Sequence, residues 1–250
     1  MTGETAAIFL ALLIGVSLGA LGSGGSVVTL PILVYVAGVP PKEAVGMSLA
    51  IVGATSLFGC LFHWRQGNFR LRPAVVFGVT GMCGSWFGSM GTHLISSSAL
   101  MLTFAAIMLV VGARMVLSKP SAAGPNGECR LVVCVPAGFV VGLVTGLLGV
   151  GGGFLIVPAL VWFAGLDAKK AIGTSLGIIA VNSAAGLAGQ LRFTQFDWRL
   201  TAEFLVCALI GMGAGIAIVK RTPERGLRRA FAVAVIMVGL AIAWRVLARM

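Results

Sequence analysis

Polar sequence is scarce in this chain. Only 10% of its 250 residues are charged and 58% are hydrophobic, and the longest stretch free of an apolar run extends from about Ser118 to Arg130. So short a stretch leaves no room for a water-soluble domain. The apolar runs, in contrast, approach the length of about 20 residues that crosses a bilayer as a helix. The composition therefore predicts an integral membrane protein whose functional site lies within the membrane.

Acidic residues are especially few. The chain has 7 Asp and Glu against 18 Lys and Arg. Glu203 falls just inside an apolar segment, and the other six lie in loops or at segment edges. Because cation carriers and proton pumps normally place a carboxylate deep in the helix bundle, this distribution favours an anionic or neutral substrate. Basic loops at one membrane face explain the net charge of +11, so we predict no nucleic-acid partner.

Motifs for catalysis and for cofactors are also missing from the sequence. It contains no Ser/His/Asp grouping and no His or Cys residues at the spacing of metal ligands. The glycine-rich stretches GSGG and GVGGG lack the Lys-Ser/Thr ending of a phosphate-binding loop. We therefore predict that the protein is not an enzyme and that it uses no cofactor and no metal.

A glycine-rich stretch that occurs twice is the most informative feature. Residues 19–31 read GALGSGGSVVTLP, and residues 146–158 read GLLGVGGGFLIVP. A shift of 127 residues aligns 19–72 with 146–199 without a gap, with 21 identities in 54 positions. The chain is therefore an internal duplication, as in many secondary transporters.

Ten apolar segments, five in each half, define the expected fold. They lie at about 5–21, 24–38, 44–62, 73–92, 99–117, 131–148, 151–166, 171–190, 200–219 and 230–248. We predict an all-α integral membrane protein with a first membrane repeat at 1–117, a cytoplasmic linker at 118–130 and a second membrane repeat at 131–250. Because five is odd, the two repeats have inverted topology. The first two segments of each repeat are short, which predicts broken helices or short hairpins that either span the membrane or return.

The basic residues predict the orientation of the chain. Under the inverted topology, thirteen Lys and Arg fall on one face of the membrane and five on the other. The positive-inside rule makes the first face cytoplasmic. Both termini are then expected outside.

The two glycine breaks form the first part of the predicted binding site. Non-helical backbone at membrane depth is tolerated where protein buries it or where it lines a water-filled cavity. Each break is followed directly by a helical run, whose free N–H groups and positive dipole end favour an anion. The residues assigned to substrate binding here are Gly22, Ser23, Gly24, Gly25, Ser26, Gly149, Gly151, Gly152 and Gly153. The alternative is that these glycines only allow close helix packing, which is the better explanation for Gly84, Gly88 and Gly211.

A face of small and polar residues on the third segment of each repeat forms the second part. Positions 48, 52, 55, 59 and 63 share one helical face, and positions 175, 179, 182, 186 and 190 are their equivalents. Such faces donate hydroxyl and amide hydrogens to a substrate. The residues assigned to binding are Ser48, Thr55, Thr174, Ser175 and Asn182. Hydrogen bonds across helices, or back to their own backbone, explain these residues equally well.

Two arginines end these third segments, one at each membrane face under the inverted topology. We expect Arg65 and Arg192 to attract substrate anions towards the site. The alternative is that both side chains extend to lipid headgroups at the interface.

The duplicated pattern GxGGx(5)P, at Gly22–Pro31 and Gly149–Pro158, resembles the TauE/SafE family of sulfite exporters and related anion permeases. The element PKEAVGMSL at Pro41–Leu49, with its counterpart AKKAIGTSL at Ala168–Leu176, is similar to that family as well. The resemblance covers nearly the whole chain. It implies a bacterial or archaeal protein of the cell (inner) membrane that moves sulfite, an organosulfonate or a small organic anion, usually outward.

These features together predict a secondary membrane transporter, an exporter of a small sulfur-containing anion that works by alternating access around the two glycine breaks. The alternative is a passive anion channel, or a membrane subunit that recruits a soluble partner. The expected partners are the small anion and the lipid bilayer, with a coupling proton or sodium ion and a homo-oligomer as further options. The sequence leaves open the anion, the coupling ion, the direction of transport and the oligomeric state.

Overall fold

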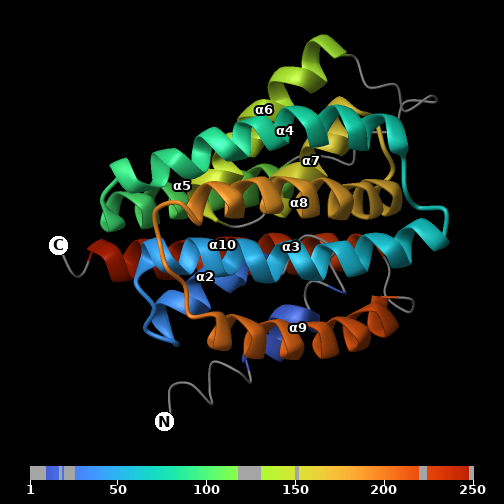
Figure 1. The fold of residues 1–250 in the computed structure, drawn as a ribbon. Coiled ribbons are helices and arrows are strands. Elements are labelled where there is room, and N and C mark those ends of the chain that lie inside the picture. The colour runs from blue at the N-terminus through green and yellow to red at the C-terminus, as the bar shows by residue number, and fades with distance from the viewer. Residues whose placement is uncertain are drawn as a thin grey trace.

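The computed structural model of the chain describes residues 10–16, 19, 26–117, 131–149, 152–219 and 224–247. Within these ranges every regular element is helical, as predicted, and residues 10–16 form a short helical segment (Figure 1). The other elements are α2 (Ser26–Tyr35), α3 (Pro41–Arg65), α4 (Leu71–Gly91), the 3-10 turn η1 (Thr92–Leu94), α5 (Ser97–Leu117), α6 (Leu131–Leu148), α7 (Gly153–Phe163), α8 (Ala168–Gln190), α9 (Trp198–Val219) and α10 (Glu224–Leu247). The predicted linker at 118–130 lies outside the described residues.

Helices in the described part of the chain include some that are long enough to cross a membrane and two that are much shorter. Five stretches are long and apolar enough to cross a membrane, namely Pro41–Arg65, Ser97–Arg114, Leu131–Leu148, Lys169–Gln190 and Trp198–Gly215. In contrast, α2 has 10 residues and α7 has 11. At about 1.5 Å per residue these two helices cover roughly half of the 30 Å hydrocarbon layer. The prediction of short helices next to the glycine breaks is confirmed for α2 and α7, whereas α6 has a full 18 residues.

The two short helices end in the same way. After α2 the N–H of Val39 donates to the C=O of Leu33 over 3.0 Å, and after α7 the N–H of Leu166 donates to the C=O of Leu160 over 3.3 Å. The glycine before each donor has a positive φ, 72° after α2 and 62° after α7. In each case the accepting C=O lies six residues before the donor, and a left-handed glycine turns the chain back over the end of the helix. Both helices therefore stop at equivalent positions of the two sequence copies.

Helices α3 and α8 lie antiparallel at the centre of the molecule. A Cβ on Gly173, near the start of α8, would lie 3.0 Å from the Cβ of His63, near the end of α3. At the other end of the pair, a Cβ on Gly186 would lie 3.2 Å from the Cδ1 of Leu49. Residue numbers thus rise along α3 as they fall along α8, and Figure 1 shows the two helices side by side.

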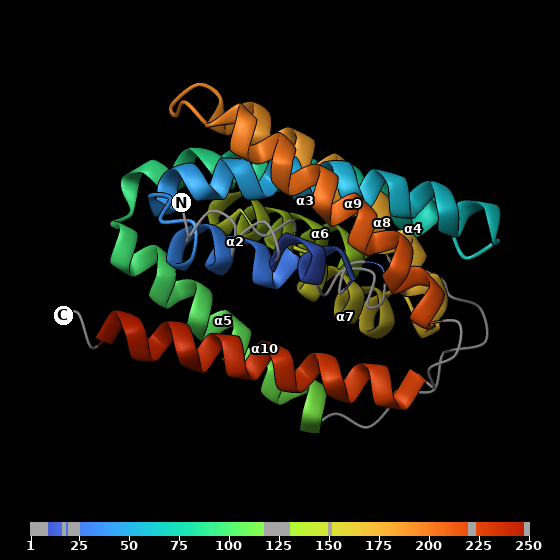
Figure 2. The same cartoon turned by 90° about the horizontal axis from the view of Figure 1, so that it is seen from below.

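The remaining helices form layers around this central pair. Helix α4 packs on α8 and, more extensively, on α6, while α9 packs on the other side against α3. Figure 1 shows this order, with α4 and α6 above α8 and with α9 below α3. Helices α5 and α10 pack on each other along one side of the bundle, as Figure 2 shows.

Close helix contacts recur at equivalent positions of the two halves. A Cβ on Gly84 of α4 would lie 2.8 Å from the backbone nitrogen of Leu143 in α6. A Cβ on Gly211 of α9 would lie 3.0 Å from the backbone nitrogen of Val16. Each residue of the second contact is 127 positions from one of the first. The packing role predicted for Gly84 and Gly211 is therefore confirmed, since no side chain fits between the backbones.

The distribution of apolar side chains fits a bundle surrounded by lipid. Phe77, Phe104 and Phe204 are completely buried between helices. Many other large apolar side chains are exposed on the outside of the bundle, among them Phe87 on α4 and Ile210 on α9. A water-soluble protein rarely exposes so much apolar surface, whereas lipid tails are a suitable environment for it.

Candidate functional site

The second glycine break is a true interruption of the helix. Helix α6 ends at Leu148, and the N–H of Gly149 donates to the C=O of Thr145 over 2.9 Å. The φ angles of Gly149 and Gly152 are 68° and 64°, in the left-handed region that favours glycine. Helix α7 then begins at Gly153. The predicted break is confirmed in this copy, although Gly151 lies outside the described residues.

Protein atoms surround this break closely. A Cβ on Gly149 would lie 2.6 Å from the Cα of Val45 in α3, and one on Gly152 would lie 3.1 Å from the Cβ of Thr145 in α6. Gly149, Gly152 and Gly153 are all buried. The break thus meets the condition for non-helical backbone at membrane depth, because helices α3 and α6 shield it from lipid.

Helix α7 begins directly after the break, so its N-terminus lies at the break. The C=O of Gly152 accepts hydrogen bonds from the N–H groups of Leu155, over 2.9 Å, and Ile156, over 2.8 Å. Helix N-termini carry a partial positive charge and unsatisfied N–H groups, which favour a negative ligand. In the first copy, α2 begins at Ser26, whereas Gly22, Ser23, Gly24 and Gly25 lie outside the described residues.

The polar residues predicted on α3 and α8 are all buried, and some have a partner within the protein. The hydroxyl of Thr55 donates to the C=O of Ile51 over 2.7 Å, and that of Ser175 donates to the C=O of Ile172 over 2.8 Å. These two hydroxyls are therefore satisfied by their own helices, as the alternative explanation expected.

The other polar residues predicted on the two helices do not bond to their own helix in this way. The hydroxyl oxygen of Thr174 accepts a hydrogen bond from the N–H of Arg70 over 3.0 Å. In contrast, the Ser48 hydroxyl and the Asn182 side-chain oxygen are buried and have no hydrogen-bond partner within the described part of the chain. Leaving such a group unpaired costs about 1 to 3 kcal/mol, so these two groups are better candidates for a ligand contact.

Part of the predicted polar face packs against other helices. Val52 is buried in an apolar cluster that includes Ile156 of α7. At Gly59, a Cβ would meet the terminal methyl group of Met212 in α9 and would lie 3.1 Å from a Leu176 methyl group. Positions 52 and 59 therefore contribute to helix packing. The polar part of this face of α3 is limited to Ser48, Thr55 and His63.

Two buried hydroxyls escaped the sequence prediction. The hydroxyl groups of Ser56 in α3 and Ser183 in α8 are completely buried and have no hydrogen-bond partner within the described residues. The two serines are identical residues at equivalent positions of the aligned copies. This identity between the two copies could have identified both serines as candidate site residues. The sequence analysis did not choose them, because each lies next to the polar helical face and not on it. The imidazole Nδ1 of His63 is also buried without a partner within these residues.

Arg65 and Arg192 lie at opposite ends of the antiparallel pair, as predicted. Arg65 is the last residue of α3, and Arg192 follows the end of α8. Both are exposed. The guanidinium carbon of Arg192 lies 4.9 Å from the ring centre of Trp86, a cation–π contact of the kind seen at interfaces. This position suits either attraction of anions or contact with headgroups.

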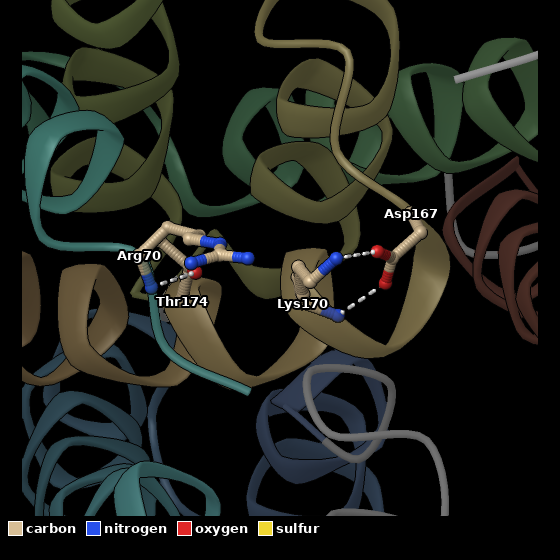
Figure 3. A network of polar contacts seen from close by, with 4 residues as sticks. All are labelled: Arg70, Asp167, Lys170 and Thr174. Carbon is tan, nitrogen blue, oxygen red and sulfur yellow. Dashed lines mark hydrogen bonds and ion pairs between the residues drawn. The ribbon is translucent and has the colours of Figure 1, made fainter. Parts of the chain in front are cut away.

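A polar network joins the start of α8 to the loop before α4 (Figure 3). Lys170 forms an ion pair of 2.6 Å with Asp167, whose carboxylate also accepts a 2.9 Å hydrogen bond from the backbone N–H of Lys170. Partial burial alone would raise the pKa of Asp167. The hydrogen bonds from Lys170 and the charges of Lys170 and Arg70 outweigh it and hold the pKa of this carboxyl below its ordinary value.

A second network lies at the opposite end of α8. The Nε2 atom of His93 lies 3.0 Å from the side-chain oxygen of Gln190, and the amide nitrogen of Gln190 donates to the C=O of Ser89 over 3.4 Å. Lys42 at the start of α3 donates to the C=O of His93 over 3.2 Å. This network connects three helices from the two halves of the chain.

The electrostatic character of the buried polar groups is uniform. Among the described residues, the buried polar side chains are hydroxyls with one asparagine and one glutamine, and none carries a formal charge. The same residues contain no group of three or more His, Cys, Asp or Glu that could hold a metal ion. The interior therefore offers neutral hydrogen-bond donors and acceptors to a ligand.

Comparison with known proteins gives a consistent result. Residues 7–242 match the protein family described as Sulfite exporter TauE/SafE. A "Probable membrane transporter protein" of Xylella fastidiosa (strain 9a5c) is 34% identical over 242 residues, which cover 93% of this chain and 92% of the relative. "Probable membrane transporter protein YdhB" of Bacillus subtilis is 26% identical, covering 93% of this chain and 97% of the relative. A similar protein of the archaeon Methanocaldococcus jannaschii is 29% identical and covers 73% of this chain and 72% of the relative.

The matches agree with the helical bundle, its apolar surface and its membrane-length helices. They also agree with the resemblance to the TauE/SafE family that the glycine and PKEAVGMSL patterns indicated. The family is one of membrane transporters, which confirms that the protein is not an enzyme. The chain is a multi-pass membrane protein that belongs to the sulfite exporter TauE/SafE family.

Proposed function

We propose that this protein is a secondary transporter that exports a small sulfur-containing anion, such as sulfite or an organosulfonate, by alternating access. Two inverted membrane repeats, residues 1–117 and 131–250, move relative to each other around the two glycine breaks. The single observation that carries the proposal is that the same helix contacts recur at positions 127 residues apart. One set lies between α4 and α6, and the other lies between residues 10–16 and α9. The family match supports the choice of sulfite as the first substrate to test.

The recurring contacts support the inverted repeats in detail. Beside the Gly84 and Gly211 contacts, a Cβ on Gly15 would meet the C=O of Ala208, and a Cβ on Gly142 would meet the C=O of Gly81. In both cases the first helix of one half packs on the fourth helix of the other half. A pseudo-twofold axis through an antiparallel pair produces this exchange of partners, and inverted repeats of secondary transporters have such an axis in the membrane plane.

An anion is the substrate class that the site favours. The break before α7 offers a helix N-terminus, and the buried groups near the centre are neutral hydroxyls and an amide. We propose that the second break binds the anion through Gly149, Gly151, Gly152 and Gly153, and the first through Gly22, Ser23, Gly24, Gly25 and Ser26. Ser48, Thr174 and Asn182 then orient the anion, with Thr55 and Ser175 beside them. Arg65 and Arg192 raise its concentration at the two ends of the central pair.

Unequal helix contacts on the two sides support alternating access. On one side, Ser85 of α4 donates a 2.7 Å hydrogen bond to the C=O of Asn182 in α8. At the equivalent place on the other side, Met212 of α9 separates that helix from Gly59 of α3. Helix α4 accordingly packs more extensively on α8 than α9 does on α3. A transporter with inverted repeats closes one such interface while it opens the other.

The orientation follows from the basic residues. We propose that the face with thirteen Lys and Arg is cytoplasmic and that both termini lie outside a bacterial or archaeal inner membrane. We also propose that a proton or a sodium ion is coupled to transport and that the protein forms a homo-oligomer.

Flux measurements in proteoliposomes test the function. Purified wild-type protein should show saturable counterflow of labelled sulfite that responds to an imposed gradient. Gly152→Ala should abolish this flux, because the new methyl group would occupy the position of the Thr145 hydroxyl in a backbone conformation that alanine disfavours. Gly78→Ala is the matched control, since a Cβ at Gly78 meets nothing within 4 Å.

Each result of this experiment has a clear meaning. Unsaturable flux that does not couple to a gradient would instead indicate a passive channel. A complete lack of flux by the isolated protein would indicate a subunit that depends on a partner. Normal flux by Gly152→Ala would exclude the second glycine break as the binding site, even if the protein is a carrier.

A further inference from the structure

Unpartnered polar groups lie along the α3 and α8 pair, and three of them lie near its middle. Five buried side-chain atoms among the described residues have no hydrogen-bond partner, and they belong to Ser48, Ser56, His63, Asn182 and Ser183. All three of Ser56, Asn182 and Ser183 are at most 1% exposed. A membrane protein normally satisfies such groups, because the lipid around it offers no hydrogen bonds. The three groups near the middle of the pair, on Ser56, Asn182 and Ser183, are therefore candidates for contact with a ligand.

The packing of α3 on α8 locates these groups. A Cβ on Gly53 of α3 would lie 3.0 Å from the Cβ of Ser183 and 3.9 Å from its hydroxyl oxygen. Ser56 lies three residues after Gly53, which places it on the same face of α3 one turn further on. Ser183 and Ser56 therefore both lie at the contact between the two helices, one contributed by each half of the chain.

This place is also the centre of the sequence symmetry. Thr55 and Asn182 are 127 residues apart, as are Ser56 and Ser183. The antiparallel register, with His63 beside Gly173 and Leu49 beside Gly186, sets residues 54–55 of α3 opposite residues 181–182 of α8. The two serine hydroxyls thus lie on either side of the point where the two halves meet.

We propose that Ser56, Ser183 and the side-chain amide of Asn182 form a central substrate-binding site, called the central step below because the substrate passes it during transport. This site selects singly charged oxyanions. The inference rests on the proposed transport function and names its central binding residues and the charge class of its substrate. The two hydroxyls and the NH2 group of the amide are neutral donors that hydrogen bond to the oxygens of a hydrogen sulfite or sulfonate group, whereas the unpartnered Asn182 oxygen only accepts, as from the O–H of hydrogen sulfite.

Charge selection follows from the absence of a buried counter-ion. Within the described part of the chain, no Lys or Arg is among the buried residues of the bundle, and the partly buried His63 lies two helical turns beyond Ser56. The cost of removing an ion from water rises steeply with its charge, and neutral donors compensate a single charge far better than two. Hydrogen sulfite and alkyl sulfonates therefore pass through this step, whereas sulfate does not.

Isosteric variants test the central step. Ser56→Ala and Ser183→Ala in the full-length protein should each weaken methanesulfonate binding about tenfold, as loss of a hydrogen bond to a charged group predicts, and the double variant should lose more. Ser56→Thr and Ser183→Thr keep the hydroxyl and should retain binding. Thr201→Val is the matched control, because the Thr201 hydroxyl donates over 2.7 Å to the C=O of Asp197, the residue just before its own helix α9.

A stability measurement separates ligand binding from a structural role. The two alanine variants should unfold at the same temperature as the wild type or higher, since each removes a buried hydroxyl that has no partner among the described residues. A lower unfolding temperature together with unchanged binding would overturn the proposal, because the serines would then serve the fold.

Competition defines the charge class in the same preparation. Excess methanesulfonate should inhibit sulfite counterflow by the wild type, and sulfate at equal concentration should not. Equal inhibition by sulfate would overturn the charge selection. If the wild type transports sulfite, and Ser56→Ala and Ser183→Ala bind methanesulfonate and transport sulfite as well as the wild type does, these serines do not bind the substrate. The proposed transport function would still stand. If the wild type transports no anion, the transport function itself fails, and this inference fails with it.

Discussion

The imidazole of His93 and the side chain of Gln190 are in contact, with 3.0 Å between Nε2 and Oε1. This contact joins η1, at the end of α4, to the last residue of α8. The ring of His93 also packs on Phe193, with 4.6 Å between ring centres. One end of the close α4–α8 interface is therefore held by a polar contact between the two halves of the chain.

Removal of the His93 ring should weaken this end of the interface. His93→Ala leaves the buried side chain of Gln190 without its imidazole partner and should lower the free energy of unfolding by about 1 to 3 kcal/mol. His63→Ala is the comparison, because the buried Nδ1 of His63 has no partner to lose among the described residues. Thermal unfolding of the purified variants in detergent measures both effects. A larger loss in His63→Ala than in His93→Ala would contradict this assignment.

Asp167 should contribute a small, pH-dependent stabilisation at the start of α8. Its folded pKa lies below the ordinary value of 3.8, so its contribution is present above that value and is lost as the pH falls through the folded pKa. Asp167→Asn keeps the N-cap but loses the ion pair with Lys170. Because both side chains are partly exposed, the loss at neutral pH should be below about 1 kcal/mol.

The two replacements of Asp167 separate the ion pair from the cap. Asp167→Ala loses the capping hydrogen bond as well and should cost about 1 kcal/mol more than Asp167→Asn. Unfolding curves from pH 7 to pH 3 check the sign. A difference between wild type and Asp167→Asn that grows towards acid pH would show that burial, rather than Lys170, controls this carboxyl.

Sequence reasoning predicted the features that follow from periodic patterns. Apolar runs predicted the helices, so the segment expected at 131–148 agrees with α6, Leu131–Leu148. The doubled glycine stretch predicted the break before α7, because directly adjacent glycines, unlike the spaced glycines within α9, favour non-helical backbone. The segment expected at 151–166 agrees with α7, Gly153–Phe163, which is followed by the positive φ of Gly165.

Features that depend on which helix faces which could not be predicted in this way. The polar face of α3 was chosen by spacing alone, and spacing does not reveal that Gly59 faces Met212. Nor does it reveal that the Thr55 hydroxyl bonds to its own helix, while the Ser56 hydroxyl next to it has no partner among the described residues. One residue rotates a side chain by about 100° around a helix, so this difference arises only from tertiary packing.

Equivalent glycines in the two halves should respond alike to substitution. Gly84→Ala and Gly211→Ala each place a methyl group against the backbone of a neighbouring helix, at Phe139 and Leu12 respectively. Neither backbone moves without shifting a whole helix, so each variant should lose at least about 1 to 3 kcal/mol of unfolding free energy. Gly213→Ala is the matched control in α9, since a Cβ at Gly213 meets nothing within 4 Å, and it should be neutral or slightly stabilising. Thermal unfolding of the three variants makes the comparison, and a strong loss in one of the first two with none in the other would contradict equivalent packing of the two halves.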